Sequence, residues 1–309
     1  MHSSNFSYAI LGTGGVGGYF GGRLALCGHN VKFLFHSDYD HVQAHGLVVH
    51  SHKGDFHLPQ VQAFDNVANM GPADVVLVCL KTTNELLLTS LLPPLVHNDS
   101  IVILIQNGIG VEDEVTAILA TKLPHIQLVA GLAFICSEKI APGEVNHQFY
   151  GSINLAPFSV RPQNLQRLQA IAQDFIQSGV PINILDYLEA RWKKAVWNMP
   201  FNGLSVVRMC QTDALVREPN IALVRKLMLE VIAAAQALGA KNITPAFAEQ
   251  MIESTQRMPP YSPSMRVDFD HHRPMEVEFL YRRPLALAAK AGAPMTHMAE
   301  VMKPLLDNY

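Results

Sequence analysis

The chain has 309 residues, 49% of them hydrophobic, and a formal net charge of −3. This length predicts one large or two medium domains, and the hydrophobic fraction indicates a folded core rather than disorder. The charge argues against binding to nucleic acid or to an anionic membrane surface, and no apolar stretch reaches the roughly 18 residues that a spanning helix needs. We expect no signal peptide. Four widely spaced cysteines predict buried free thiols, which favours a soluble cytoplasmic protein.

The first motif lies close to the N-terminus. Residues 8–11 form an apolar run typical of a strand, and a helical pattern follows the glycine-rich segment that comes next. A G-x-G-x-x-G pattern in this context predicts dinucleotide binding. Gly12 would make the tight turn, Gly14 would let the backbone approach a pyrophosphate, and Gly17 would let the helix pack on the strand. The helix N-terminus would add N–H groups and a positive dipole end. The predicted cofactor residues here are Gly12, Thr13, Gly14, Gly15, Val16 and Gly17.

The first half of the chain alternates strand-like and helix-like segments. Continuous apolar runs, which are typical of parallel strands covered on both faces, predict strands at 8–11, 31–35, 75–80, 101–105 and 127–133. Helical spacing occurs at 84–92 and 111–119, and another helix begins at Pro162. Residues 46–61 predict a hairpin or an irregular excursion, and residues 182–185 a last strand. Together these segments indicate βαβ units in an open parallel sheet.

The second half changes character. Helical periodicity is found at 188–210, 219–238, 244–258, 276–291 and 294–306. We therefore predict an α/β protein with a Rossmann-type parallel-sheet domain over residues 1–185. An all-helical domain over residues 186–309 would follow and carry the substrate and catalytic groups.

Three polar residues lie in the first predicted helix of the second half. Lys194, Asn198 and Asn202 are spaced by four residues, which places them on one face of a helix. An ammonium and two amides are costly to bury without a purpose, so this row predicts a site. A solvated stripe on the helix surface is the alternative interpretation.

Other polar residues follow strand ends or turns. Lys81 and Asn107 come after two predicted parallel strands, where open α/β sheets bind ligands, although such residues also serve as ordinary turn residues. Ser264 lies near a turn-rich start, and Glu276 begins a predicted helix. Histidines crowd residues 41–57, but no carboxylate or cysteine set accompanies them, so we expect no metal site.

In their order and spacing these motifs resemble the ketopantoate reductases (2-dehydropantoate 2-reductases). The resemblance covers nearly the whole chain, and it includes the glycine motif, Gln106-Asn107-Gly108, Pro142-Gly143-Glu144-Val145 and the lysine–asparagine row. The step of eleven residues from Met265 to Glu276 also matches the family. The resemblance implies NADPH-dependent reduction of 2-dehydropantoate to (R)-pantoate, a step toward coenzyme A.

The resemblance also implies residue roles. Lys194 matches the family's general acid, and a cleft that desolvates its ammonium would lower its pKa toward neutrality. Asn198 and Asn202 would hold the substrate, and Ser264 would hydrogen-bond its carboxylate. Glu276 would bind the substrate hydroxyl, a contact that discriminates strongly between substrates.

For the cofactor, the resemblance implies that Lys81 and Asn107 face the cofactor and the reacting end of the substrate. The family usually has an arginine after the second strand that binds the 2′-phosphate of NADPH, and this chain has His36 and Ser37 there. Both could contribute to phosphate binding, whereas Asp38 could suit a ribose hydroxyl. NADP(H) is the favoured cofactor, with NAD(H) as the alternative.

Two further departures keep other functions open. Pro263 replaces a serine before Ser264, and Tyr281-Arg282 replaces an Asn-Gly pair that would permit close helix contact. Arg282 and Arg283 are expected at a solvated helix edge. These departures are compatible with a divergent reductase of another 2-keto acid. A separate alternative is a non-catalytic NADP(H)-binding sensor, against which the retention of the lysine–asparagine row, Ser264 and Glu276 argues. The chain's partner would be a small-molecule keto acid, and a homodimer is possible.

Overall fold

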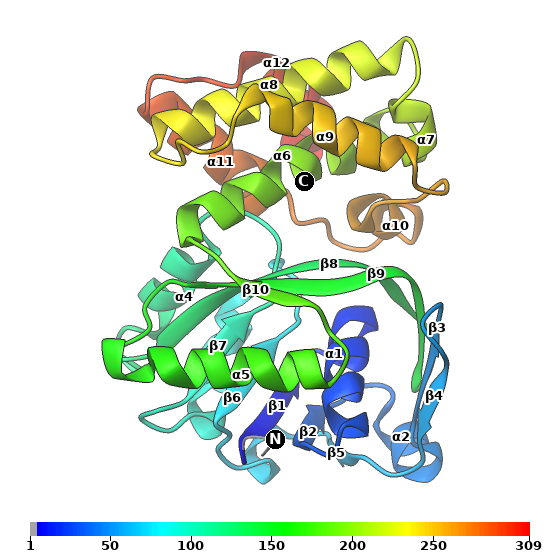
Figure 1. Ribbon diagram of the computed structural model, residues 1–309, viewed down its shortest axis with the longest axis vertical. Helices are drawn as coiled ribbons and strands as arrows, with labels where there is room; N and C mark the ends of the chain where they lie inside the picture. The colour runs from blue at the N-terminus through cyan, green and yellow to red at the C-terminus, as the bar shows by residue number, and fades with distance from the viewer. Residues whose placement is uncertain (1–4) are drawn as a thin grey trace. The chain divides into compact units, whose positions relative to one another are not determined.

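The computed structural model describes residues 5–309, which form two compact units (Figure 1). The first unit contains the described residues up to Gln106 together with Glu112–Asp186. The second contains Tyr187–Tyr309 and the short segment Asn107–Val111. The Gln106-Asn107-Gly108 motif is therefore divided, with Gln106 in the first unit and Asn107 and Gly108 in the helical unit.

The first unit is built on one mixed sheet. Its ten strands are β1 (Ser7–Leu11), β2 (Asn30–Leu34), β3 (Leu47–Ser51), β4 (Phe56–Leu58), β5 (Gln62–Phe64), β6 (Val75–Val78), β7 (Ile101–Leu104), β8 (Gln127–Ala141), β9 (Glu144–Pro157) and β10 (Ile182–Ile184). The order is β4-β3-β9-β8-β7-β6-β1-β2-β5, with β10 paired to β9. Strands β8, β7, β6, β1, β2 and β5 run parallel, as predicted for a Rossmann-type sheet.

Helices cover this sheet and connect its strands. They are α1 (Gly15–Leu26), α2 (Tyr39–His45), α3 (Leu88–Leu91), α4 (Val111–Leu119) and α5 (Leu165–Gln177), with short 3₁₀ turns η1 (Val67–Asn69), η2 (Glu85–Leu87), η3 (Pro93–Leu95) and η4 (Pro162–Asn164). Helices α1 and α5 pack beside each other on the sheet (Figure 1). The central strands β1, β6 and β7 are fully buried along most of their length, which explains their continuous apolar runs.

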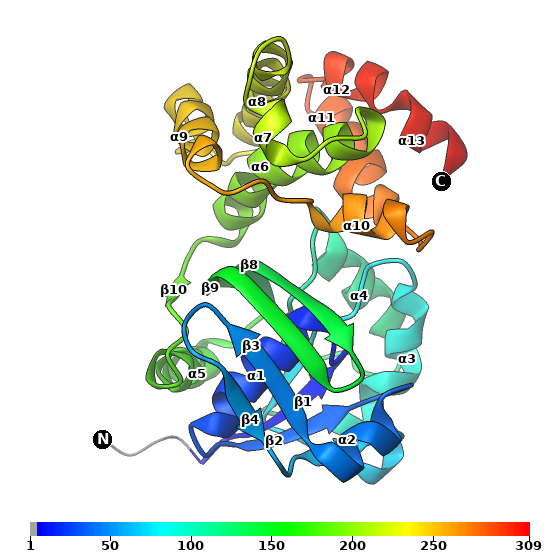
Figure 2. The same ribbon diagram turned by 90° about the vertical axis from the view of Figure 1, so that its right-hand side faces the viewer.

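One large element of this unit differs from the prediction. Strand β8 continues to Ala141 instead of ending at residue 133, and β9 returns antiparallel to it (Figure 2). The apolar signal is weak here because the inward position of His147 is polar, while Phe149 and Tyr150 are exposed. The cysteines also differ in part, since Cys27 follows the end of α1 and is exposed rather than buried.

The second unit is helical, as predicted. Its elements are α6 (Tyr187–Val207), α7 (Thr212–Leu215), α8 (Asn220–Ala237), α9 (Pro245–Gln256), α10 (Ser264–Asp270), the π-helical turn η5 (Glu278–Arg282), α11 (Arg283–Lys290), α12 (Thr296–Val301) and α13 (Lys303–Asn308). Helix α6 is central and contacts α7, α8, α9, α10, α12 and α13. Short α7 and α10 were not predicted, because a helix of one or two turns carries little periodicity.

Tyr281 lies in the core of this unit. It is fully buried, and its hydroxyl donates a 2.8 Å hydrogen bond to the Met199 carbonyl of α6. Burial raises the pKa of this phenol far above its usual value. The room for the ring comes from Gly203, where a Cβ atom would lie 2.6 Å from the Tyr281 hydroxyl. Where the family usually has a glycine after residue 281, the space for close packing here comes from Gly203 on α6.

Replacing Tyr281 by phenylalanine should lower the free energy of unfolding by about 1 kcal/mol, because one buried hydrogen bond is lost while the ring stays in place. Urea unfolding followed by circular dichroism measures this change. Tyr309→Phe is the matched control, since that ring is 55% exposed. Equal stability of both variants would show that the Tyr281 hydroxyl contributes nothing.

No helix within residues 5–309 is both long enough and apolar enough to cross a membrane.

Candidate functional site

The glycine motif in the first unit forms a close-packed turn. Gly12 has φ +91°, and a Cβ atom there would lie 2.9 Å from backbone atoms of Cys79 and Leu80. A Cβ at Gly17 would lie 2.3 Å from the Gly12 carbonyl oxygen, and one at Gly15 would lie 2.4 Å from the Ser137 carbonyl oxygen. Three of the predicted glycines are therefore required by the close approach of the β1–α1 turn to its neighbours.

The start of α1 is suited to a phosphate. Gly14 caps the helix without a side-chain hydrogen bond, and the first turn carries no acidic residue. A Cβ at Gly14 would meet no atom within 4 Å, so this side of the turn is open. Free N–H groups and the positive end of the helix dipole form an anion site. Thr13 secures the turn through a 2.9 Å bond to the Leu34 carbonyl, and Val16 packs on the core. These features fit the pyrophosphate of a dinucleotide.

The other predicted cofactor residues of this unit lie at strand ends. His36 and Ser37 are exposed just beyond β2, and Lys81 is exposed just beyond β6. The carboxyl ends of parallel strands are where such sheets bind ligands. Asn107 lies in the second unit and is partly exposed.

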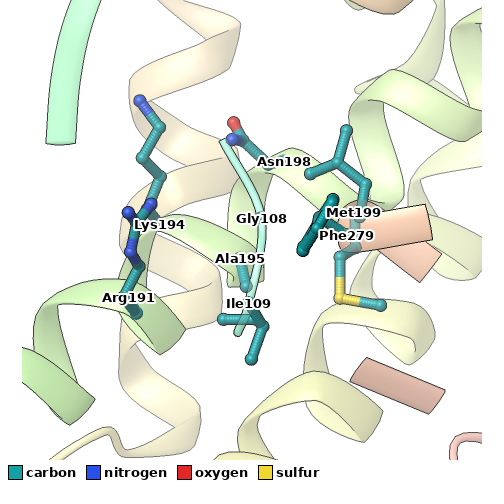
Figure 3. A pocket seen from close by; sticks show the side chains of 9 residues that line it. Gly108, Ile109, Arg191, Lys194, Ala195, Asn198, Met199 and Phe279 are labelled. Carbon is teal, nitrogen blue, oxygen red and sulfur yellow. The ribbon is translucent and has the colours of Figure 1, made fainter. Parts of the chain in front are cut away.

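The second unit contains a pocket on one side of α6 (Figure 3). Its lining residues are Gly108, Ile109, Arg191, Lys194, Ala195, Asn198, Met199, Phe279 and Leu280. Lys194 and Asn198 are the two sequence-predicted residues among them. Figure 3 shows their side chains, with that of Arg191, beside the segment that carries Gly108.

Hydrogen bonds connect the predicted substrate residues of α6 with one another and with neighbouring segments. The Asn198 side chain donates to the Asn107 side-chain oxygen at 3.3 Å, and the Asn202 side chain donates to the Asn198 carbonyl at 3.0 Å. The Asn202 side-chain oxygen accepts from the Met265 amide at 3.2 Å and from the Ser264 hydroxyl at 3.4 Å. Asn198 and Asn202 are only 8% and 2% exposed, so the row is not a solvated stripe.

Lys194 has an unusual electrostatic environment. Burial, assisted by the neighbouring positive charge of Arg191, lowers the pKa of its ammonium to about 7, although the negative charge of Glu276 acts in the opposite direction. Glu276 is 6% exposed and lies two residues before the start of η5. A lysine with a pKa near neutrality can exchange a proton with a bound molecule under physiological conditions.

The short segment 107–111 is held against η5. Gly108 has φ +113°, and a Cβ there would lie 2.4 Å from the Cβ of Phe279. The Ile109 amide donates to the Phe279 carbonyl at 2.9 Å, and the Arg283 guanidinium donates to the Gly110 carbonyl at 3.2 Å. A π-helical turn beside a polar pocket is common at functional sites. Arg282 and Arg283 were predicted at a solvated edge, but both are only partly exposed, because Arg282 donates to the Leu306 carbonyl and Arg283 to the Gly110 carbonyl.

The pocket residues that sequence reasoning missed include a charged one and an aromatic one. Arg191 lies one turn before Lys194 on α6 and is 3% exposed, and Phe279 lies in η5. The i, i+3 spacing of Arg191 and Lys194 could have indicated a shared face. Nothing in the sequence pattern relates Phe279 to Gly108.

Histidines lie near one another without forming a metal centre. The rings of His41 and His45 are 4.7 Å apart, and those of His52 and His147 are 4.8 Å apart. Within residues 5–309, no three side chains of histidine, cysteine, aspartate or glutamate come together in a way that could hold an ion.

Comparison with known proteins identifies the family. Residues 8–159 match ketopantoate reductase PanE/ApbA, and residues 186–305 match the C-terminal part of the same family. The chain belongs to the ketopantoate reductase family. It is 46% identical to the 2-dehydropantoate 2-reductase of Nostoc sp. over 290 residues, which cover 92% of this chain and 89% of that protein. The resemblance seen in the sequence motifs is thereby confirmed.

Solved structures agree with this assignment. The 2-dehydropantoate 2-reductase of Geobacter metallireducens is 37% identical, with a TM-score of 0.90 over 97% of this chain and 99% of that one. The enzyme of Methylococcus capsulatus is 32% identical, with a TM-score of 0.86 over 97% and 96%. The chain is accordingly an oxidoreductase of the 2-dehydropantoate 2-reductase type that acts on a small molecule.

Proposed function

We propose that this protein reduces 2-dehydropantoate to (R)-pantoate with NADPH, a step toward coenzyme A. The observation that carries the proposal is the connected polar row of the helical unit, in which Lys194, Asn198 and Asn202 lie on one side of α6 with Ser264 and Glu276 close by. A sensor that only binds a cofactor has no need of a proton donor, so this row also favours an enzyme.

The cofactor would bind to the first unit. Gly12, Gly14 and Gly17 would admit its pyrophosphate to the N-terminus of α1, where the open side of the turn offers backbone N–H groups. Lys81 and Asn107 would contact the cofactor as well. When bound, the reduced nicotinamide supplies the hydride that the carbonyl carbon of the substrate accepts.

Lys194 would act as the general acid. As the carbonyl carbon of the substrate gains a hydride, its oxygen becomes an alkoxide and takes a proton from the Lys194 ammonium. The lowered pKa makes this ammonium a better acid than an ordinary lysine, and the nearby Glu276 carboxylate favours its charged form. The lysine is then neutral and regains its proton from solvent.

The remaining polar residues would orient the substrate. Asn198 and Asn202 would hold it along α6, and the Ser264 hydroxyl, which is exposed at the start of α10, would donate to its carboxylate. Glu276 would accept a hydrogen bond from the substrate hydroxyl. A keto acid without this hydroxyl could not form this hydrogen bond to the buried carboxylate, which disfavours its binding.

The pH dependence of kcat follows from the role of Lys194. The acid form of the lysine is required, so kcat should be at its plateau below the pKa of about 7 and fall as the pH rises through it. The measurement is kcat at saturating substrate and cofactor over neutral and alkaline pH. A value of kcat that stays constant through pH 7 and above would exclude Lys194 as the acid.

A substrate panel tests the proposed activity. Values of kcat/KM would be measured for 2-dehydropantoate and for 2-keto acids that lack its hydroxyl or its branched carbon. Preference for 2-dehydropantoate by a factor of about 10² or more is expected if Glu276 recognises the hydroxyl. A clear preference for another keto acid would make the protein a divergent reductase, and tight NADPH binding without any turnover would make it a sensor.

A further inference from the structure

The end of β2 carries conflicting signals about the cofactor. His36 and Ser37 are exposed there and could bind a phosphate, whereas Asp38 follows directly. An acidic residue at this place in a Rossmann-type fold commonly binds the ribose hydroxyls of NAD and disfavours the 2′-phosphate of NADP. The cofactor preference therefore depends on what the Asp38 carboxylate contacts.

The Asp38 carboxylate is already occupied within the first unit. The Lys139 ammonium donates to both of its oxygens, at 2.8 and 2.9 Å. The Ser37 hydroxyl donates to Oδ1 at 2.9 Å, and the Gly143 amide lies 3.3 Å from Oδ2. A carboxylate has about four lone-pair sites, so these four contacts saturate it. Asp38 is 5% exposed, and its hydrogen bonds hold its pKa below the usual value despite burial. It has no acceptor left for a ribose.

Lys139 is the outer partner of this ion pair. Its side chain is 39% exposed, against 6% for that of Asp38, so a ligand from solvent meets the ammonium rather than the carboxylate. An ammonium has three N–H donors, and Asp38 takes two of them. Because Lys139 and Ser37 bind the same carboxylate oxygen, the ammonium is fixed beside the Ser37 hydroxyl.

The other lysine near this strand is committed elsewhere. Lys32 of β2 donates to the carbonyls of Met70 and Pro72, at 2.7 and 3.2 Å. His36 stands where the family usually has an arginine, and an imidazole lacks the permanent positive charge of a guanidinium. A fixed positive charge at the end of β2 thus has to come from another element, and β8 supplies it through Lys139.

We propose that Lys139 is a specificity-determining residue that binds the 2′-phosphate of NADPH together with His36, and that Asp38 is a positioning residue that holds its ammonium beside Ser37. This proposal rests on the proposed use of a nicotinamide cofactor. It explains how the chain would favour NADPH without the arginine, and why an aspartate at this position does not select NADH.

Binding calorimetry of NADP⁺ and NAD⁺ to the full chain tests the proposal without turnover. In Lys139→Gln, the Kd for NADP⁺ should rise by about 10- to 100-fold, as for the loss of one charge-assisted hydrogen bond, while the Kd for NAD⁺ stays unchanged. Lys122→Gln is the matched control, because it removes the same charge from a lysine that donates to the Thr89 carbonyl. It should leave both constants unchanged.

A second variant tests whether a loss of NADP⁺ affinity in Lys139→Gln results from destabilisation of the fold. Lys139→Gln leaves a buried carboxylate without its main partner, so the double variant Asp38→Asn with Lys139→Gln removes both charges. It should show the same selective loss of NADP⁺ affinity. A parallel loss of NAD⁺ affinity in the double variant, or an unchanged Kd for NADP⁺, would overturn the role of Lys139.

The same titrations of the wild-type protein distinguish failure of the role of Lys139 from failure of the proposed function. Tighter binding of NAD⁺ than of NADP⁺ would overturn the role of Lys139 and leave a reductase that uses NADH. Failure to bind either dinucleotide would overturn the proposed function itself.

Discussion

Lys194→Ala is expected to lower kcat by a factor of ~10²–10⁴, the usual contribution of a positioned general acid. The variant loses the ammonium whose pKa of about 7 allows it to give a proton to the developing alkoxide. The Kd of NADPH should change little, because the glycine turn that would hold the cofactor belongs to the other unit. Steady-state kinetics and calorimetric titration with NADPH measure the two quantities.

Lys193→Ala is the matched control. Lys193 lies on the same helix and carries the same charge, but its ammonium is 3.7 Å from Glu189 on the preceding turn and does not line the pocket. This variant should keep kcat within a factor of about 3, since an exposed ion pair contributes little. Near-normal turnover in Lys194→Ala would remove this lysine from the mechanism.

Gly108→Ala is expected to have the second large effect. The residue would have to adopt φ +113°, and its Cβ would lie 2.4 Å from the Cβ of Phe279 and 2.8 Å from the Phe279 carbonyl oxygen. Strain and overpacking together should lower the free energy of unfolding by about 3 kcal/mol. The displaced segment 107–111 would also move Asn107 from Asn198, so kcat/KM should fall in the protein that remains folded.

Gly54→Ala separates strain from packing. Gly54 has φ +111°, almost the same as Gly108, but a Cβ there would meet no atom within 4 Å. The Gly54→Ala variant should lose about 1–2 kcal/mol of unfolding free energy, and its kcat/KM should not change. Guanidinium unfolding and steady-state assays compare the two variants. Equal losses of stability and unchanged kinetics in both would contradict the role of the Gly108–Phe279 contact.

The strands of the sheet could be predicted from the sequence where both of their faces are buried. Strands β1, β6 and β7 are covered on both faces, so their sequences are continuous apolar runs that identify parallel strands. Strand β9 escaped notice because polar and exposed side chains, among them His147 and Tyr150, interrupt its pattern. The longer helices of the second unit could be predicted because each buries one face and keeps a 3.6-residue period, whereas the short α7 and α10 could not.

In the helical unit, periodicity alone predicted the candidate site only along α6. Lys194, Asn198 and Asn202 are related by a local spacing, which the helix converts into one face. Contacts between distant segments leave no such trace. The Gly108–Phe279 contact and the Asp38–Lys139 ion pair join residues 171 and 101 positions apart, and neither could be read from periodicity. Asp38 is the clearest case, since its residue type suggested a contact with the ribose, while its carboxylate is bound by Lys139 of the same unit.

The central claim is that the protein reduces 2-dehydropantoate with NADPH and that Lys194 on α6 supplies the proton. The most direct test is the oxidation of NADPH, followed by its absorbance, when 2-dehydropantoate is added to the wild-type protein and to Lys194→Ala. The account predicts rapid oxidation by the wild type that depends on both substrates, and a rate lower by ~10² or more in the variant. Equal rates in both proteins, or no oxidation by a wild-type protein that binds NADPH, would contradict it.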